Sequence, residues 1–337
     1  MTSSNPHTPP RILVSQKSAR DLEALLKNER DLPAQLLVAE QQTPGVEFDA
    51  ALISRDVTSS STKQITVPST QTYYDLLLNS QDLRWVQIHS AGADRQIYLD
   101  LMARGVKVSG SSGVNAQLVM QNAIAGILML ARKFPLMLKA QAERRWDSLI
   151  NHALPPDLVG QTAVIIGRGP IGSGIARVLQ AIGVKTILVG FNTSLKLSKL
   201  ASDDVRHISE LSELLTQAQW LVLACPLSSE TRGLMNRDSM KLLPNGSHII
   251  NIARGEIIVE PDLIEALKSK KLAGAYLDVF ASEPLDSSSP LWVMDNVIVT
   301  PHSAGHSAGN EQRVLELFVE NLRLFAHGER LKNQIVS

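Results

Sequence analysis

The sequence predicts an α/β protein made of two doubly wound domains, each with a parallel sheet, and three observations support this fold class. Short apolar runs alternate with helical patterns along most of the chain, which is the rhythm of βαβ units. A glycine-rich turn joins one of these runs directly to a helix. The chain has 337 residues, 44% of them hydrophobic and 20% charged, which is enough for two domains of ordinary size.

The first half of the chain begins with ten polar, proline-containing residues, for which we expect a disordered leader. Four β-rich runs follow, separated by helical patterns such as ARDLEALLKNE. These runs are ILV at 12–14, LLVA at 36–39, ALIS at 51–54 and WVQIHS at 85–90. Their spacing predicts βαβ units that form one parallel sheet.

The second half repeats this pattern after PPDLVG. The predicted strands are TAVIIG, KTILVG, WLVLAC, HIINIA, GAYLDVF and NVIVTP. Helical patterns such as GPIGSGIARVLQAIG and EPDLIEALKSK separate them. The sequence therefore predicts a second α/β domain.

Two further helices are predicted outside these repeats. Residues 114–134 are apolar on nearly every face, which is typical of a helix buried on several sides at a domain or subunit boundary. Residues 309–328 are amphipathic and must pack against a core, although the sequence does not say which one. The apolar stripe of this last helix consists of Val314, Leu317, Phe318, Leu322 and Phe325.

Composition narrows the possible partners. The 33 basic and 33 acidic residues cancel, and no dense Lys/Arg run indicates a nucleic-acid or membrane surface, so we expect a small-molecule partner. The N-terminus lacks the apolar stretch of a signal peptide, and the single cysteine excludes an intramolecular disulfide, so we expect a cytoplasmic protein. That cysteine, Cys225, lies in the apolar run WLVLACPL and is predicted to be a buried strand thiol.

A phosphate-binding loop is predicted in TAVIIGRGPIGSGIARV. Gly167 allows a tight turn, Gly169 allows close approach of a pyrophosphate, and Gly172 allows the helix to pack on the strand. Arg168, Pro170 and Ile171 complete the loop, and the helix N-terminus points at the anion. The alternative is a tight βα turn without a ligand, but the strand-turn-helix context favours dinucleotide binding.

The acidic residue that reads the ribose in NAD sites is missing at the end of the next strand. That strand ends at Gly190, and no acid appears before Asp203. Asn192 and Ser194 follow as neutral donors, with lysines nearby, which is chemistry suited to a 2′-phosphate. We therefore expect NADP(H) to be preferred and NAD(H) to be possible. The alternative is an ordinary solvated loop in an NAD site that does not select between the two cofactors.

Three ionisable residues follow strand ends in the same half of the chain: Arg254, Glu283 and His302. Arg254 could hold a substrate carboxylate, His302 could transfer a proton, and Glu283 could orient the imidazole. Each residue alone also has a structural interpretation, as a surface ion pair, a turn residue or a loop histidine. His302 and His306 show no further His or Cys cluster, so no metal site is predicted.

The segments NIARGEIIVEPDLIEALKSKKLAGAYLDVFASEPL, NVIVTPHSAG and GRGPIG resemble the signature of the D-isomer-specific 2-hydroxyacid dehydrogenase family. The resemblance implies that Arg254 anchors the substrate and that Glu283 is the partner of His302, the acid/base. It also implies cofactor contacts and, from HSAGAD, backbone contacts to the substrate carboxylate. The implied cofactor contacts are Asp278, Ala253 and Pro226, and the implied substrate contacts are Gly92 and Ala93.

The resemblance further implies an architecture. Residues 11–108 and 304–337 are expected to form a discontinuous flavodoxin-like substrate-binding domain, into which a Rossmann NAD(P)-binding domain at 109–303 is inserted. A homodimer is usual in the family, and the apolar helix near Ala123 becomes a candidate contact. The chain departs from the family pattern at Met120-Gln121-Asn122, where many relatives have Ala-Glu-His or Ala-Glu-Trp, and at Gly190.

The leading hypothesis is an NADPH-preferring reductase of small 2-oxo acids, of the glyoxylate or hydroxypyruvate type, that yields D-2-hydroxy acids. Alternatives are an NAD(P)H-sensing interaction protein like the corepressors that share this fold, and an NAD-dependent member such as a short phosphoglycerate dehydrogenase. A methyltransferase would leave Arg254, Glu283 and His302 unexplained. Arg144, Arg145 and Trp146 are either substrate contacts or a solvated helix end with one packed indole.

Overall fold

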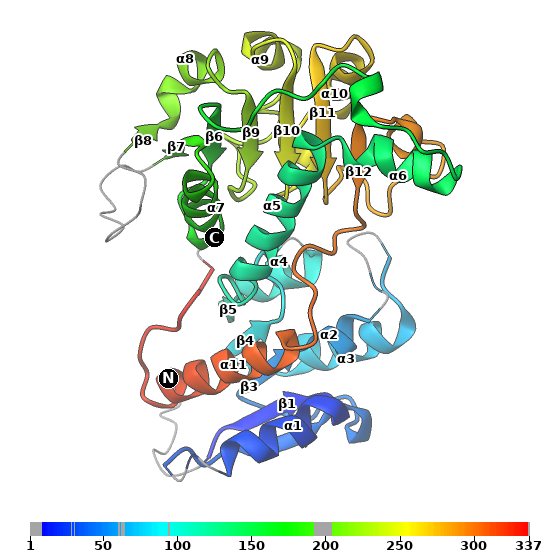
Figure 1. The fold of residues 1–337 in the computed structure, drawn as a ribbon. Helices are drawn as coiled ribbons and strands as arrows, with labels where there is room; N and C mark the ends of the chain where they lie inside the picture. The colour runs from blue at the N-terminus through cyan, green and yellow to red at the C-terminus, as the bar shows by residue number, and fades with distance from the viewer. Residues whose placement is uncertain are drawn as a thin grey trace. The chain divides into compact units, whose positions relative to one another are not determined.

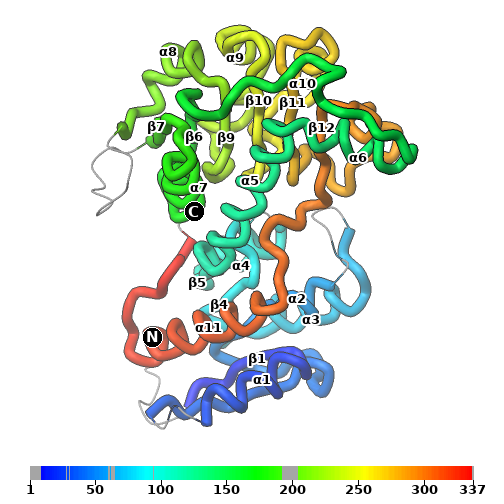
Figure 2. Tube along the Cα trace, in the orientation of Figure 1, coloured from blue at the N-terminus to red at the C-terminus, as the bar shows by residue number. Residues whose placement is uncertain are grey.

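The structure is a computed structural model that describes residues 9–27, 29, 31–59, 61, 65–93, 95–191 and 204–335. Its contacts divide the chain into two compact units: unit 1 is Met1–Asn115 with Ser307–Ser337, and unit 2 is Ala116–His306. Figures 1 and 2 trace the chain through both units. The expected leader lies outside the described residues except for its last two positions.

Unit 1 contains a five-stranded sheet in the order β2-β1-β3-β4-β5, and every neighbouring pair is parallel. The four predicted strands are present, and the fifth was not predicted because its sequence, KVS, contains a single apolar residue. The strands are β1 (Arg11–Val14), β2 (Gln35–Val38), β3 (Ala50–Ile53), β4 (Trp85–Ile88) and β5 (Lys107–Ser109).

Helices cover both faces of this sheet because its strands are apolar on both sides. Ile12 and Val14 face a core completed by α1 and α11, whereas Leu13 faces a core completed by α3 and α4. The helices of unit 1 are α1 (Gln16–Leu26), α2 (Arg55–Thr58), α3 (Pro68–Asn79), α4 (Gln96–Ala103) and α11 (Asn310–Ala326).

The amphipathic last helix packs in unit 1. Val314, Phe318 and Leu322 of α11 are buried in the core that also holds Trp85 of β4. The rings of Trp85 and Phe318 are stacked with centroids 5.0 Å apart. The apolar stripe was correctly predicted, and the structure identifies the core that it covers.

Unit 2 contains a seven-stranded, all-parallel sheet in the order β12-β11-β10-β9-β6-β7-β8 (Figure 1). The six predicted strands are present, and β8, whose sequence VRH contains a single apolar residue, was not predicted. The strands are β6 (Thr162–Ile166), β7 (Lys185–Gly190), β8 (Val205–His207), β9 (Trp220–Leu223), β10 (Ser247–Asn251), β11 (Leu272–Leu277) and β12 (Val297–Val299). Two parallel sheets with helices confirm the predicted α/β class with a Rossmann domain.

Both faces of the second sheet are also covered. Val164 and Ile166 of β6 face one core, and the alternating residues Ala163 and Ile165 face the other. The helices of unit 2 are α5 (Ala116–Ala131), α6 (Phe134–Ala142), α7 (Pro170–Ala181), α8 (Leu211–Leu215), α9 (Arg237–Leu242) and α10 (Glu260–Lys268). Helices α8, α9 and α10 contribute to the first core, and α5 and α7 to the second.

The predicted apolar helix at 114–134 ends at Ala131. Lys133 has a left-handed backbone with φ 53°, and α6 begins immediately afterwards with Pro135 in its first turn. Ala123 and Ile127 of α5 are fully or almost fully buried in the core that α7 shares. The helix is therefore covered by its own unit along this face. Among the described residues, no helix combines the length and apolarity that a bilayer crossing needs.

Candidate active site

The site residues predicted in unit 2 follow the carboxyl ends of its strands. Gly167 follows β6, Arg254 follows β10, Asp278 follows β11 and His302 follows β12. Because the whole sheet is parallel, these ends lie at one edge, where ligands bind in open α/β sheets. The topology therefore gathers the glycine loop and the ionisable residues at one edge of unit 2.

Two glycines of the loop are required by the packing of the chain itself. Gly167 has φ 125°, and a Cβ there would lie 2.3 Å from the carbonyl oxygen of Ala224. A Cβ at Gly172 would lie 2.0 Å from the carbonyl oxygen of Gly167. Any larger residue at either position would push the turn away from the sheet.

Gly169 is different because the chain does not need a glycine there. Its φ is −71°, and a Cβ would have no neighbour within 4 Å. Gly169 is the N-cap of α7, whose first residue is Pro170, so open space lies directly at a helix N-terminus. Such a cradle suits the pyrophosphate of a dinucleotide, and Gly169, Pro170 and Ile171 are the residues that would border it.

Arg168 lies against Gly190 at the end of β7. A Cβ at Gly190 would be 2.3 Å from Cδ and 3.0 Å from Cγ of the arginine. The motif places Arg168 in the loop. It does not show that the side chain lies beside Gly190, the position at which NAD sites carry an acid, because a motif does not give the direction of a side chain. The predicted contacts Asn192 and Ser194 lie outside the described residues.

The turn that carries Arg254 is held by Asn251. The Asn251 amide accepts from the N–H of Ala253 at 3.1 Å and donates to the carbonyl of Arg254 at 3.0 Å. Nη1 of Arg254 donates to the carbonyl of Ala253 at 2.7 Å, and the guanidinium is half-buried. These bonds fix the turn, so the guanidinium projects from a rigid base.

Gly255 is a site residue that sequence reasoning missed. A Cβ there would lie 1.8 Å from the carbonyl carbon of Phe280 and 2.2 Å from the backbone nitrogen of Ala281. The glycine therefore lets the loop after β10 press directly on the loop after β11. The sequence shows only that a glycine follows Arg254. It does not show which part of the backbone this glycine approaches.

Glu283 and His302 form a pair, as their proposed chemistry requires. Nδ1 of His302 lies 2.8 Å from Oε2 of Glu283. The other carboxylate oxygen of Glu283 accepts from the N–H of Phe280 at 3.0 Å, which fixes its orientation. The imidazole side chain remains 47% exposed and the carboxylate 21% exposed, so the ring can reach a ligand while its partner holds it.

Asp278 lies under the turn that carries His302. Its carboxylate accepts from the Thr300 hydroxyl at 2.6 Å, from the N–H of Ser303 at 2.8 Å and from the N–H of Ala304 at 3.1 Å. Asp278 is only 2% exposed. Its primary neighbours are thus the residues around His302, and a cofactor contact would come in addition to these bonds.

The remaining predicted cofactor contacts follow the neighbouring strands. Ala253 is 7% exposed, and Pro226 is exposed with its carbonyl bonded to the Thr231 hydroxyl at 2.9 Å. Cys225 is buried, as predicted, although it lies two residues beyond β9, and burial raises the pKa of its thiol to about 11. Within the described chain, no three His, Cys, Asp or Glu side chains gather as metal ligands.

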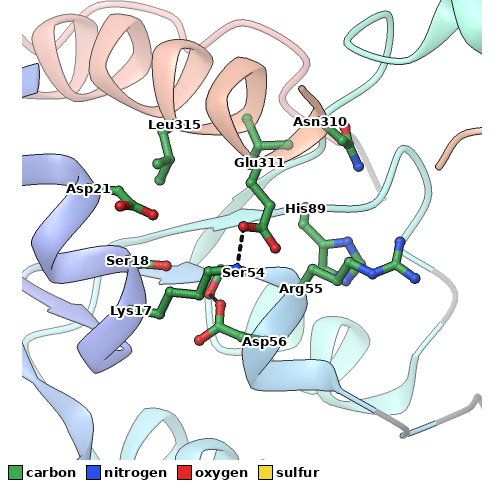
Figure 3. A pocket seen from close by; sticks show the side chains of 11 residues that line it. Lys17, Ser18, Asp21, Ser54, Arg55, Asp56, His89, Asn310, Glu311 and Leu315 are labelled. Carbon is green, nitrogen blue, oxygen red and sulfur yellow. Dashed lines mark hydrogen bonds and ion pairs between the residues drawn. The ribbon is translucent and has the colours of Figure 1, made fainter. Parts of the chain in front are cut away.

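Unit 1 has its own pocket at the carboxyl ends of its strands (Figure 3). It lies between the chain segments that follow β1 and β3, where the strand order reverses, with about 340 Å³ of empty space that includes open solvent. Asn310 lines it and is 6% exposed, and its Oδ1 has no hydrogen-bond partner among the described residues. Gly92 and Ala93 follow β4 at the same edge, and the Ser90 hydroxyl donates to the Gly92 carbonyl at 2.9 Å.

Arg144, Arg145 and Trp146 follow α6. Arg145 pairs with Glu143 at 2.7 Å and with Asp147 at 2.8 Å, and Arg144 has φ 55°. The Trp146 side chain is 99% exposed, so the expectation of a packed indole is wrong for this chain by itself. Trp146 lies in an irregular segment four residues beyond the end of α6, and the described residues of unit 2 leave its ring uncovered.

Comparisons with known proteins concern the family of the chain and its fold. The sequence profile described as "D-isomer specific 2-hydroxyacid dehydrogenase, NAD binding domain" matches residues 124–304, more than half of the chain. The chain is 31% identical over 251 residues to a hydroxypyruvate reductase of Blautia hydrogenotrophica, covering 73% of this chain and 77% of that protein. It is 30% identical over 261 residues to a human glyoxylate reductase/hydroxypyruvate reductase, covering 75% and 77% respectively.

Among solved structures, a D-isomer specific 2-hydroxyacid dehydrogenase from Xanthobacter autotrophicus, in complex with NADPH and MES, superposes with a TM-score of 0.76. It is 27% identical, and the match covers 98% of both chains. The dinucleotide cradle, the paired Glu283 and His302, and these similarities lead to one conclusion. The chain belongs to the D-isomer-specific 2-hydroxyacid dehydrogenase family, a family of NAD(P)-dependent enzymes.

Proposed function

We propose that this enzyme reduces small 2-oxo acids of the glyoxylate and hydroxypyruvate type to D-2-hydroxy acids, with NADPH as the preferred cofactor. The observation that carries the proposal is the 2.8 Å contact between His302 Nδ1 and Glu283 Oε2, at the sheet edge that also presents the glycine loop. A carboxylate-held imidazole at such an edge is the arrangement that a proton transfer to a carbonyl needs.

Three residues of the chain have separate roles in the proposed reaction: one binds the substrate, one donates a proton and one stabilises the charge of the proton donor. The reaction takes its hydride from a reduced nicotinamide. Arg254 holds the substrate carboxylate through two parallel hydrogen bonds and polarises the neighbouring carbonyl. His302 donates a proton from Nε2 to the carbonyl oxygen, since its Nδ1 faces Glu283. Glu283 stabilises the positive charge on the ring and fixes its direction.

Two features, one at the end of β7 and one in the glycine loop, support NADPH over NADH. No carboxylate stands at Gly190 to repel a 2′-phosphate, and the side chain of Arg168 reaches that strand end. A guanidinium binds a phosphate strongly because it offers several donors in a planar fork. Arg168 is therefore the residue to which we assign the 2′-phosphate, and NADH remains a weaker alternative.

For the substrate, we infer that unit 1 is the substrate-binding domain, with boundaries near 11–108 and 304–337, and that unit 2 is the dinucleotide-binding domain near 109–303. The backbone amides of Gly92 and Ala93 are assigned to the substrate carboxylate. The two relatives are a hydroxypyruvate reductase and a glyoxylate reductase/hydroxypyruvate reductase, which supports these small 2-oxo acids as first candidates.

We further propose a homodimer. Several large apolar side chains of unit 2 are exposed and cluster in the sequence between α6 and β6, which an isolated chain would leave in water at a cost. They are Trp146 at 99%, Ile150 at 78%, Val159 at 72% and Leu154 at 67%. Light scattering on the purified chain tests this assignment, and a monomeric mass at micromolar concentration would contradict it.

The experiment that tests the proposed function is the initial rate of NADPH and NADH oxidation with glyoxylate, hydroxypyruvate, pyruvate and phenylpyruvate. We expect turnover with the first two acceptors and a higher kcat/KM with NADPH. Comparable values with both cofactors would overturn the NADPH preference alone. Tight dinucleotide binding without turnover on any acceptor would overturn the reductase assignment.

A further inference from the structure

Tyr276 fills a space between β11 and α5 that only a glycine leaves open. The residue is 3% exposed, and its ring packs against Gly126 of α5. A Cβ at Gly126 would lie 2.4 Å from Cγ of the tyrosine, so the helix and the ring fit each other only with this pair of residues. The glycine thereby leaves room for the ring directly against the helix.

The hydroxyl of Tyr276 joins α5 to the residues around His302. It contacts Oδ1 of Asn122, one turn before Gly126 on α5, and lies 3.0 Å from the Thr300 hydroxyl. Thr300 in turn donates to Oδ1 of Asp278 at 2.6 Å. That carboxylate receives the backbone N–H groups of Ser303 and Ala304, the two residues that follow His302.

The protons of this chain of groups can be assigned one by one. Oδ1 of Asp278 also accepts from the N–H groups of Ser303 and Ala304, so Thr300 gives its single proton to the same oxygen. The Thr300 oxygen then accepts from Tyr276, and burial raises the pKa of the phenol, which keeps it protonated. The Tyr276 oxygen can then accept a hydrogen bond from Asn122. This requires the side-chain amide of Asn122 to be flipped, so that Nδ2 takes the place of Oδ1. All hydroxyls are then satisfied.

The backbone at His302 needs such support. Its φ is 48°, a left-handed conformation that is unfavourable for a residue with a Cβ and persists only when its surroundings fix it. The N–H of His302 donates to the carbonyl of Asp278 at 2.8 Å, while the Asp278 side chain holds the next two N–H groups. Asp278 therefore fixes the turn, and Thr300 and Tyr276 fix one oxygen of Asp278.

We propose that Tyr276, acting through Thr300 and Asp278, is a positioning residue that holds the His302 turn in its left-handed conformation and keeps the imidazole in reach of the substrate carbonyl. Tyr276 touches neither substrate nor cofactor in this assignment. The proposal rests on the proposed role of His302 as proton donor. It also gives a role to Asn122, where the chain departs from the Ala-Glu-His or Ala-Glu-Trp of its relatives.

The first test is Tyr276→Phe, which keeps the ring against Gly126 and removes only the hydroxyl. We expect kcat for glyoxylate to fall by about tenfold, because small displacements of a catalytic group are costly, while the affinity for NADPH changes by less than about twofold. The solvent deuterium isotope effect on kcat should rise, because proton transfer is the step that loses its alignment. Hydrogen exchange at the amides of Ser303 and Ala304 should become faster.

A matched control is Tyr73→Phe in unit 1. Tyr73 is also buried, and its hydroxyl donates to the carbonyls of Leu13 and Leu52 at 3.0 and 2.9 Å. Loss of the Tyr73 hydroxyl should lower the melting temperature as much as Tyr276→Phe does. It should not change kcat, the solvent isotope effect on kcat or hydrogen exchange at residues 303 and 304. The comparison separates positioning from a general loss of stability.

Thr300 supplies the second variant set. Thr300→Val should reproduce Tyr276→Phe, Thr300→Ser should retain activity because it keeps the hydroxyl, and the double variant should be no worse than either single one. Fully additive losses, or a Tyr276→Phe enzyme with normal kcat and normal exchange at Ser303 and Ala304, would overturn the proposal. If the wild-type protein turns over no acceptor, the proposed function fails, whereas the exchange measurement still decides whether Tyr276 holds the turn.

Discussion

The side chain of Arg168 occupies the space that a side chain at Gly190 would need: a Cβ at Gly190 would lie 2.3 Å from the arginine Cδ. The two positions are 22 residues apart in the chain, but β6 and β7 are neighbours in the sheet, so the glycine loop and the end of β7 meet. Because position 190 carries no side chain, the cationic side chain of Arg168 can lie at the end of β7. An acid at 190 would pair with the arginine and remove it from any ligand.

Cofactor choice should therefore depend on both positions. Arg168→Leu should raise KM for NADPH by about tenfold or more, the effect of losing a charged hydrogen bond, and should leave KM for NADH nearly unchanged. Gly190→Asp should lower kcat/KM for NADPH and shift the preference towards NADH, because its carboxylate pairs with Arg168 and repels a 2′-phosphate. Steady-state kinetics with both cofactors provide the measurement.

The control for these variants is Arg177→Leu, which removes an exposed arginine from α7, the helix that follows the loop of Arg168. Its cofactor preference should equal that of the wild type. If Arg168→Leu weakens both cofactors equally, the guanidinium contacts a part that they share, and the assignment to the 2′-phosphate is wrong. An unchanged preference in Gly190→Asp would mean that this strand end does not face the ribose.

The second prediction concerns His302. His302→Gln should cut kcat by about 100-fold or more, as expected for loss of a general acid, while NADPH binding measured by fluorescence titration stays nearly intact. Glu283→Gln should cause a smaller loss, because the ring keeps a hydrogen-bond partner but loses the charge that stabilises its protonated form. His306→Gln, four residues further on, is the control and should retain activity. Normal turnover in His302→Gln would remove this histidine from the mechanism.

Much of the fold was predictable because its signals are local. Gly167 and Gly172 are required by contacts within a single strand-turn-helix unit, and the motif predicts that unit directly. Arg254 and His302 could be placed at one edge because every strand of a parallel sheet ends there. The strands β5 and β8 could not be predicted because their sequences, KVS and VRH, contain one apolar residue each, whereas the equally short β12 is the apolar run VIV.

The contacts that arrange the site were harder to predict from the sequence because they join segments that are distant in the chain. Gly255 approaches the backbone of Phe280, and Gly126 approaches the ring of Tyr276, and neither approach follows from spacing. Arg168 could be read as a loop residue, but its direction depends on a rotamer. A packed indole is one of two alternatives for Trp146 in the sequence, yet the described residues around it leave its side chain exposed.

The third prediction separates a glycine kept for a ligand from one kept for packing. Gly169→Ala should leave the melting temperature unchanged, since its Cβ would meet nothing within 4 Å and its φ is −71°. It should weaken NADPH binding by about tenfold or more, because a methyl group would stand where the pyrophosphate approaches the backbone. Calorimetric titration and thermal unfolding supply the two measurements.

Gly172→Ala is the matched comparison within the same loop. Its Cβ would lie 2.0 Å from a backbone oxygen, so the fold itself should be destabilised by about 1–3 kcal/mol, as overpacked positions are. An equal loss of stability in both variants would show that Gly169 also serves packing. Unimpaired NADPH binding in Gly169→Ala would place the pyrophosphate elsewhere.

The last prediction concerns the pH dependence of stability. His248 of β10 stacks on Trp220 with ring centroids 4.2 Å apart, and burial lowers its pKa from 6.5 to about 4. Between these values the unfolded chain binds a proton that the folded chain does not, so stability is present above the unfolded pKa and is lost as the pH falls towards 4. The contribution is at most about 3 kcal/mol, because each unit of pKa shift corresponds to about 1.4 kcal/mol and the ring keeps some exposure.

His248→Phe keeps a ring against Trp220 and removes the titrating group. The free energy of unfolding, measured with urea, should therefore fall less for the variant than for the wild type between about pH 7.5 and pH 5. Carboxylates elsewhere act on both proteins alike, so the difference between the two curves isolates His248. Above about pH 7.5 that difference should be constant, because the imidazole is then neutral in both the folded and the unfolded chain. Parallel curves down to pH 5 would show that water reaches the imidazole in the folded protein and that its burial does not suppress protonation.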